Sequence, residues 1–177
     1  YSPEIEMATR RCEIRLSEGL RQMTEAWKTF KRQCHEYVDS CRIAKDLAYT
    51  AKDIEMFSIA LSDFQDERGF SEKAGYFLSA FINTAKEEDF LIHTGGLTVP
   101  LLGFGYQNRK RIRVDGNVGY HVGDGMHGGS ITVEGDGGSS IGDSQNGGDI
   151  LIMGDVGDDL GRGMHSGNII VKGHALN

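Results

Sequence analysis

The sequence predicts an α+β protein: an N-terminal helical hairpin or small bundle over residues 1–89, then a right-handed parallel β-helix of about four coils over residues 90–177. Two observations favour this division. Of the 25 glycines, only three precede residue 95, so the composition changes abruptly there. Beyond it glycines recur every 19 residues, which is typical of a stacked solenoid. The most regular series is Gly116, Gly135, Gly154 and Gly173.

The first part has the apolar spacing of helices. Ser2 followed by Pro3 is a typical helix start, and the apolar residues after it are alternately four and three apart. This spacing predicts a stripe buried against another helix: Leu16, Leu20, Met23, Trp27, Phe30, Cys34, Tyr37 and Cys41. A second run, from Ile54 to Phe64, ends near Gly69. Ser71 is the expected N-cap of a third helix that buries Phe77, Leu78, Phe81 and Ile82. The pattern leaves open whether the first two helices are continuous.

The second part repeats glycines and apolar residues in step. Two apolar residues separated by one point to the same side of a strand, so equivalent residues of stacked coils should form internal ladders. The expected ladders are Val122, Ile141 and Leu160; Ile131, Ile150 and Ile169; and Val133, Ile152 and Val171. The structural glycines are Gly116, Gly119, Gly123, Gly129, Gly135, Gly138, Gly142, Gly148, Gly154, Gly157, Gly161, Gly167 and Gly173. An irregular first coil is expected from Gly96 to Gly116. The helices should cap one end of the stack, and the other should face a partner or another copy.

These repeats resemble a known family. Residues 116–133 have the form GxxGxxVGxGMxGGxIxV, and residues 154–171 repeat it. The pattern resembles the GXGXG-type β-helix of the C-terminal domain of glutamate synthase and is similar to the C subunit of formylmethanofuran dehydrogenase. The resemblance covers roughly residues 95–177 and implies a structural role beside catalytic modules that carry the redox chemistry. The chain departs from the family in having about four coils, where the family usually has more, and in its helical N-terminus.

Composition narrows the function classes. The formal charge of −7, from 19 basic and 26 acidic side chains, argues against a general nucleic-acid binder. No run approaches eighteen apolar residues, so no membrane span is expected. The three cysteines form no CxxC pair and fit a reducing cytoplasm, as buried core residues. The start, Tyr1-Ser2-Pro3, lacks a methionine and a signal-peptide core, which suggests a trimmed or processed chain.

Metal and catalytic sites find little support in the repeats. The many aspartates suggest calcium, but the period of 19 is not a multiple of nine, so solvated corner aspartates are expected. A hexapeptide acyltransferase would have coils of eighteen residues. His127 and His165 are two coils apart, about 9.6 Å, too far to share one zinc ion. An exposed polar ladder is expected there, beside a packed ladder of Met126, Gln145 and Met164. No catalytic residue, metal or cofactor is predicted.

Three hypotheses for function follow. The first is a non-catalytic scaffold or assembly subunit, with an oxidoreductase subunit as partner on the strength of the resemblance. The second is a stand-alone enzyme or small-ligand-binding protein with a site between the helices and the β-helix. Its candidate lining is Tyr106, Arg109, Arg111, Arg113, Tyr120 and His121. The third is a self-assembling homo-oligomer joined through the apolar stripe that contains Trp27 and Phe30.

Overall fold

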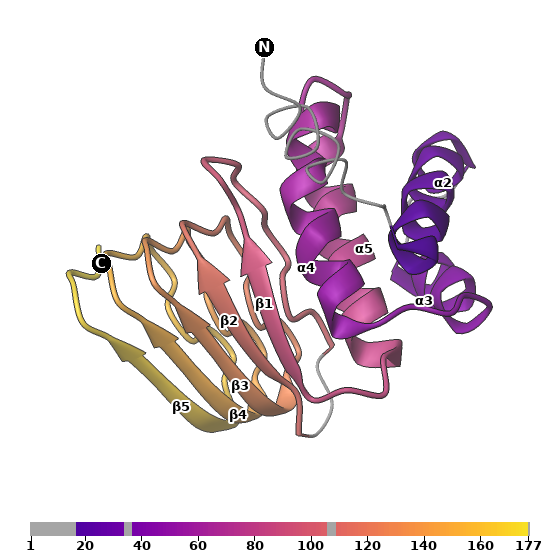
Figure 1. The fold of residues 1–177 in the computed structure, drawn as a ribbon. Helices are drawn as coiled ribbons and strands as arrows, with labels where there is room; N and C mark the ends of the chain where they lie inside the picture. Colours follow the sequence, from indigo (N-terminus) through magenta and orange to yellow (C-terminus); the bar gives the residue numbers. More distant parts are fainter. Residues whose placement is uncertain (1–16, 34–36, 106–108, 177) are drawn as a thin grey trace, which may run out of the picture.

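Helices precede a five-stranded parallel sheet in the computed structural model, which describes residues 17–33, 37–105 and 109–176 (Figure 1). The helical elements are α2 (Glu18–Gln33), α3 (Tyr37–Lys45), α4 (Ala51–Ala60), the 3-10 helix η1 (Leu61–Phe64) and α5 (Phe70–Thr84). The strands are β1 (Asp89–His93), β2 (Arg111–Asp115), β3 (His127–Val133), β4 (Asn146–Ile152) and β5 (Ser166–Val171). Sheet order follows chain order, so the predicted α+β class with a parallel β-helix is confirmed.

The strands stack in the predicted register. Ile131 pairs with Ile150, and Ile150 with Ile169, while the next inward residues form a second ladder. The first coil differs from the prediction, because it begins with a strand that carries no glycine. Phe90 pairs with Ile112 across a coil of twenty-two residues, so the irregular coil starts at Asp89 and not at Gly96. Phe90 and Ile92 are buried, which places this strand in the same core as the later ones.

The glycines shape one corner of every coil. At this corner three alternate residues have positive φ: Leu101, Gly103 and Gly105; His121, Gly123 and Gly125; Ser140, Gly142 and Ser144; and Asp159, Gly161 and Gly163. The first position is never glycine, so a residue with a side chain adopts the left-handed backbone conformation there, which costs conformational energy. The middle position is always glycine, because in the inner coils its Cβ would meet an isoleucine. At Gly123 that Cβ would lie 2.5 Å from Ile150 Cδ1.

We expect Gly123→Ala to lower the free energy of unfolding by about 2 kcal/mol, from left-handed strain and overpacking together. Ile150→Val removes the Cδ1 atom that the new methyl group would meet. The double variant should therefore lose about 1 kcal/mol less stability than the sum of the losses in the two single variants. Gly125→Ala is the matched control, since Gly125 has a φ of 63° and no atom lies within 4 Å of its Cβ position. Urea unfolding measures all four, and strict additivity would contradict the steric account.

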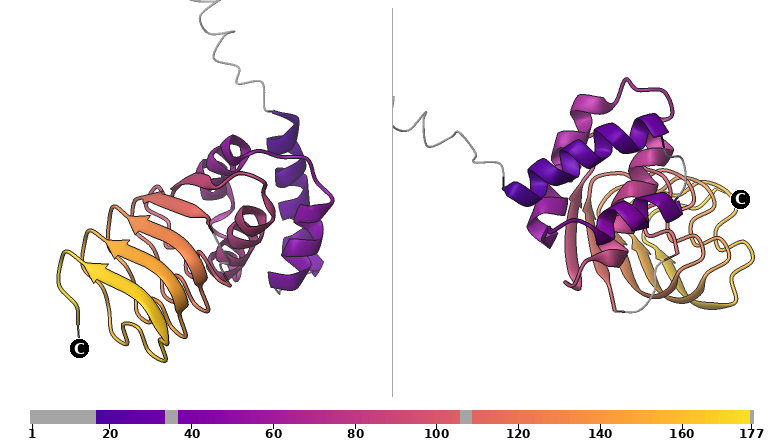
Figure 2. Two further views of the ribbon diagram at one scale, coloured as in Figure 1. Left: turned by 90° about the horizontal axis from the view of Figure 1, so that it is seen from below. Right: turned by 90° about the vertical axis from the view of Figure 1, so that its right-hand side faces the viewer.

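The helices cover the first coil and leave the last coil free. α4 and α5 pack beside β1, and α2 and α3 lie outside them (Figure 2). Ser79 of α5 donates to the Leu101 carbonyl at 3.0 Å and accepts from the Gly103 amide at 2.9 Å. Ser58 of α4 accepts from the His93 amide at 3.0 Å. The buried apolar residues of helices and coils form one continuous core.

The predicted apolar stripe is buried inside the chain. Leu20, Met23, Trp27 and Phe30 of α2 are at most 4% exposed, and Trp27 packs against aromatic rings of α4 and α5. The stripe does not run on as one helix, because α2 ends at Gln33 and α3 begins at Tyr37. Leu16 and Cys34 lie outside the described residues, as does the predicted start at Ser2. Its buried residues, Leu20, Met23, Trp27 and Phe30, are therefore not available to join two copies of the chain, which is what the third hypothesis required of the stripe.

Two predictions about helix starts are also settled. α4 is a separate helix with a capping box, in which Thr50 and Asp53 exchange side-chain-to-backbone hydrogen bonds. Ser71 is not the N-cap of α5, which begins at Phe70 after Gly69 in a left-handed conformation. The apolar face of α5 was predicted correctly: Phe77, Leu78, Phe81 and Ile82 are fully buried.

Candidate functional site

The residues predicted to line one pocket lie in three places. Arg109 borders a groove at the junction of helices and solenoid, and Arg111 and Arg113 border another groove on the outer face of the sheet. Tyr120 and His121 lie at the glycine corner. Tyr106 is outside the described residues. The structure therefore does not bring this candidate lining together.

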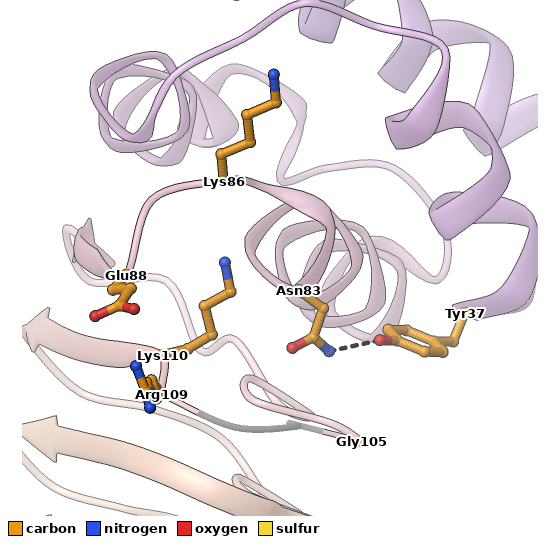
Figure 3. A pocket seen from close by; sticks show the side chains of 7 residues that line it. All are labelled: Tyr37, Asn83, Lys86, Glu88, Gly105, Arg109 and Lys110. Carbon is orange, nitrogen blue, oxygen red and sulfur yellow. Dashed lines mark hydrogen bonds between the residues drawn. The ribbon is translucent and has the colours of Figure 1, made fainter.

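The junction groove has a volume of about 890 Å³ (Figure 3). Its described lining is Tyr37, Asn83, Lys86, Glu88, Gly105, Arg109 and Lys110. Asn83 donates to the Tyr37 hydroxyl at 2.5 Å and to the Phe104 carbonyl at 3.3 Å. Burial raises the pKa of Tyr37, so the phenol stays protonated and serves as a hydrogen-bonding wall. The groove is polar and mostly cationic, because its described lining contains three basic residues, Lys86, Arg109 and Lys110, and one acid, Glu88.

Residues 109–113 form a run of basic side chains, and most of these are committed to contacts within the chain. Lys110 donates to the Ala85 and Glu87 carbonyls at 2.5 and 2.6 Å, and partial burial lowers its pKa. Arg111 binds Asp89 through two hydrogen bonds of 2.6 Å. Arg113 donates to Glu134 at 2.8 Å. Arg111 and Arg113 point outward from β2, and their side chains join neighbouring coils through these ion pairs. Arg111 and Arg113 therefore offer little free positive charge to a phosphate on the outer face of β2.

A polar cluster occupies the glycine corner. His121 Nδ1 lies 3.6 Å from Asp124 and 3.7 Å from Asp143. Asp143 is 8% exposed and accepts from Arg162 at 2.7 Å, and this hydrogen bond holds its pKa below the ordinary value. Burial raises the pKa of Asp124. Asp143 is thus a buried ion-pair partner, which corrects the expectation of a solvated corner. Among the described residues no group of three or more His, Cys, Asp or Glu side chains is arranged to hold a metal ion.

We expect Asp143→Asn to remove part of the acid sensitivity of the fold. A carboxyl group whose folded pKa is depressed stabilises the protein above its unfolded pKa, near 4, and this stability is lost as the pH falls through the folded pKa. The loss for Asp143 should be about 0.5–1 kcal/mol, because Arg162 is exposed to solvent. The raised pKa of Asp124 has the opposite effect on acid stability and offsets part of this loss. Thermal unfolding between pH 5 and about 2.5 measures the difference, with the exposed Asp158→Asn as control; parallel curves for the two variants would contradict it.

A second series of polar side chains links successive coils. Asn117 Oδ1 accepts from the Asp136 amide, Asp136 Oδ1 from the Asp155 amide, and Asp155 Oδ1 from the His174 amide, at 2.7–2.8 Å. The last of these bonds lowers the pKa of Asp155. These aspartates are exposed, as expected of corner residues, but each also satisfies a backbone donor of the next coil. The sequence analysis did not predict this ladder, although the spacing of 19 between positions 117, 136 and 155 is its signal.

The last coil leaves the ends of the internal ladders uncovered. Ile150 and Ile152 are at most 1% exposed, whereas Ile169 and Val171 of β5 are only partly buried. Val122 and Ile141 are fully buried, whereas Leu160 is 38% exposed. We call this surface the open end; it comprises Leu160, Met164, Ile169, Val171, Ala175 and Leu176.

Backbone donors also remain at the open end. Ser140 donates its amide to Asp158, Ser144 to Arg162, and Val156 to His174, each in the next coil at 2.8 Å. The residues one repeat later are Asp159, Gly163 and Ala175, and in the described part of the chain no coil lies beyond them. These three amides, on different sides of the coil, face outward in phase with the inner ones.

β5 carries none of the usual protection of an edge strand. Exposed edges are generally blunted by charged residues or proline, and the sequence of β5 is Ser-Gly-Asn-Ile-Ile-Val. The other edge strand, β1, is covered by α4 (Figure 1). The open end is therefore the best candidate functional surface: apolar, rich in free backbone donors, and unprotected.

Comparisons with known proteins do not identify a function for this surface. No protein family, no curated protein and no solved structure matches the chain. None of the helices in residues 17–33, 37–105 and 109–176 is both long and apolar enough to cross a membrane.

Proposed function

We propose that this chain is a non-catalytic assembly module that joins a partner protein through the open end of its solenoid. The observation that carries the proposal is the contrast between the two ends of the stack. Helices bury the first coil. The last coil exposes ladder residues and backbone donors, whereas the equivalent groups of each inner coil are covered by the coil that follows it. Unpaired sheet edges of this kind bind other strands readily, and the proposal assigns this one to a partner protein.

The resemblance of the repeats supplies the class of partner. GXGXG-type β-helices hold together the modules of redox enzymes, so the expected partner is an oxidoreductase subunit, working in the cytoplasm. The chain itself would then contribute rigidity: a continuous core fixes the helical part at a set distance from the partner. The substrate chemistry would belong to the partner.

Native mass analysis of the protein purified gently from its own cells tests this function. We expect the chain in a fixed ratio with at least one other polypeptide that carries flavin, iron–sulfur or another redox group. Leu160→Glu should release the chain, because it places a charge on the open end, while Val38→Glu on α3 should not. Recovery of the unaltered chain only as a free monomer would contradict an assembly role.

A ligand-binding function is the second candidate, and the junction groove is the observation that favours it. The groove lies between helices and solenoid, where that hypothesis expected a site, although only Arg109 of the predicted lining is there. Its excess of positive charge favours a small anion. The test is mass spectrometry of small molecules released when the purified protein is denatured. An organic anion present in equal amount with the chain, and lost in Lys86→Ala, would support it; a clean extract would contradict it.

A further inference from the structure

We infer that the ligand of the junction groove is an organic anion that also carries a hydroxyl group, such as a sugar phosphate or a hydroxy acid. This inference rests on the ligand-binding function proposed above as the second candidate, and it states which chemical class fits that groove. Two features of the described lining point to this class: an unpartnered hydrogen-bond acceptor and two exposed cations.

The side-chain oxygen of Asn83 is the acceptor. Asn83 donates through its amide nitrogen to the Tyr37 hydroxyl and the Phe104 carbonyl, and these two bonds fix which end of the carboxamide is the oxygen. Oδ1 is buried and has no hydrogen-bonding partner among the described residues. Figure 3 shows the amide nitrogen directed at Tyr37 and the oxygen directed away from it. A buried acceptor left unpaired is costly, so the groove favours a ligand that donates a hydrogen bond to this oxygen.

The positive charge of the groove comes from three residues, of which two are uncommitted. Lys110 is anchored on backbone carbonyls at the end of α5. Lys86 and Arg109 are exposed, and no hydrogen bond or ion pair joins either of them to another described residue. These two charges outnumber the one carboxylate in the described lining, that of Glu88. An excess of positive charge attracts anions and raises their local concentration.

The group that donates to Asn83 should be uncharged. An ammonium group would be repelled by Lys86, Arg109 and Lys110, which line the same groove. A hydroxyl group donates a hydrogen bond without carrying charge, and hydroxyl groups are the usual uncharged donors of small anionic metabolites. The groove volume of about 890 Å³ lies within the range of small-molecule sites. A hydroxylated anion therefore satisfies both the cations and the buried acceptor.

A matched pair of phosphates tests this inference. Glycerol 3-phosphate and propyl phosphate have the same charge and nearly the same length, but only the first carries hydroxyl groups. We expect glycerol 3-phosphate to bind at least about fivefold more tightly, because it gains a hydrogen bond to a buried acceptor. It should also shift the side-chain amide signals of Asn83. NMR titration measures both affinities, at constant ionic strength because salt screens the attraction of an anion.

Three variants separate the two features of the groove. Arg109→Ala should weaken the binding of both phosphates and leave the ratio of their affinities unchanged. Asn83→Leu should remove the preference for glycerol 3-phosphate. Lys28→Ala removes an exposed cation of α2 that is outside the described lining, so as the control it should change neither affinity. If Asn83→Leu does not fold, the ratio measured in the unaltered protein still decides.

Equal affinities for the two phosphates would overturn the hydroxyl requirement and leave the anion-binding function standing. Binding that does not move the Asn83 signals would also overturn the inference, because the ligand would then lie elsewhere. If neither phosphate binds, the inference is refuted. A clean extract of the purified protein would refute the ligand-binding function as well.

Discussion

Replacing Trp27 by alanine is expected to lower the free energy of unfolding by about 4 kcal/mol. The indole is fully buried, and its ring centroid lies 5.3 Å from that of Phe77, 6.0 Å from that of Phe57 and 5.9 Å from that of Phe70. Removal therefore opens a cavity where three helices meet. Urea unfolding followed by circular dichroism measures the loss, since the variant has no tryptophan fluorescence.

Val38→Ala is the control for Trp27→Ala. Val38 is 61% exposed on α3, so its truncation should change stability by less than about 0.5 kcal/mol. A loss of under about 1 kcal/mol for Trp27→Ala would contradict the packing of α2 against α4 and α5. The apolar stripe would then again be available for a partner helix.

Gly75→Ala is expected to cost about 3 kcal/mol and to loosen the helical cap from the solenoid. Gly75 lies in α5, where a Cβ would overlap the carbonyl oxygen of Pro100 and lie 2.9 Å from its carbonyl carbon. Backbone cannot move aside as a side chain can, so α5 must shift away from the first coil. Alanine favours helix over glycine by about 1 kcal/mol, so a loss would come from the contact alone.

Ser71→Ala, at a half-buried position of the same helix, is the matched control and should have little effect. Hydrogen exchange adds a second readout for Gly75→Ala. Amides of the first coil, including Gly103, should exchange faster, while those of β3 and β4 should not. A Gly75→Ala protein as stable as the parent would contradict the close contact between α5 and Pro100.

The sequence predicted the solenoid well because its constraint is periodic. Inward isoleucines and valines must recur once per coil, and the middle glycine of each corner leaves room for an isoleucine of another strand. The first coil does not follow this period. Its strand, Asp89–His93, has no glycine and belongs to a longer coil of twenty-two residues.

The helices were predicted less accurately. Apolar spacing identified the buried faces of α2 and α5, but it could not show that α2 ends at Gln33, since Tyr37 and Cys41 keep the same phase. The capping box of Thr50 and Asp53 was readable, as threonine followed three residues later by an acid. It would have separated α4 from the helices before it.

The candidate site was the least predictable part. The predicted lining combined basic and aromatic residues that are close in sequence, but the structure places them apart. Consecutive strand residues point to opposite faces and pair with coils about twenty residues away. Arg113 with Glu134 is such a pair. The open end depends on which coil the helices cover, and no local pattern reveals that. Its free donors became visible only from the hydrogen bonds of the coils before it.

Hydrogen exchange at the amides of Asp159, Gly163 and Ala175 tests the central claim most directly. It should be measured on the purified chain and on the assembly recovered from its cells. In the chain alone these amides should exchange rapidly, while their equivalents at Ser140, Ser144 and Val156 are protected. In the assembly all six should be protected. Equal protection of both sets in the isolated chain, or rapid exchange of the first three within the assembly, would contradict the open end as the surface that a partner covers.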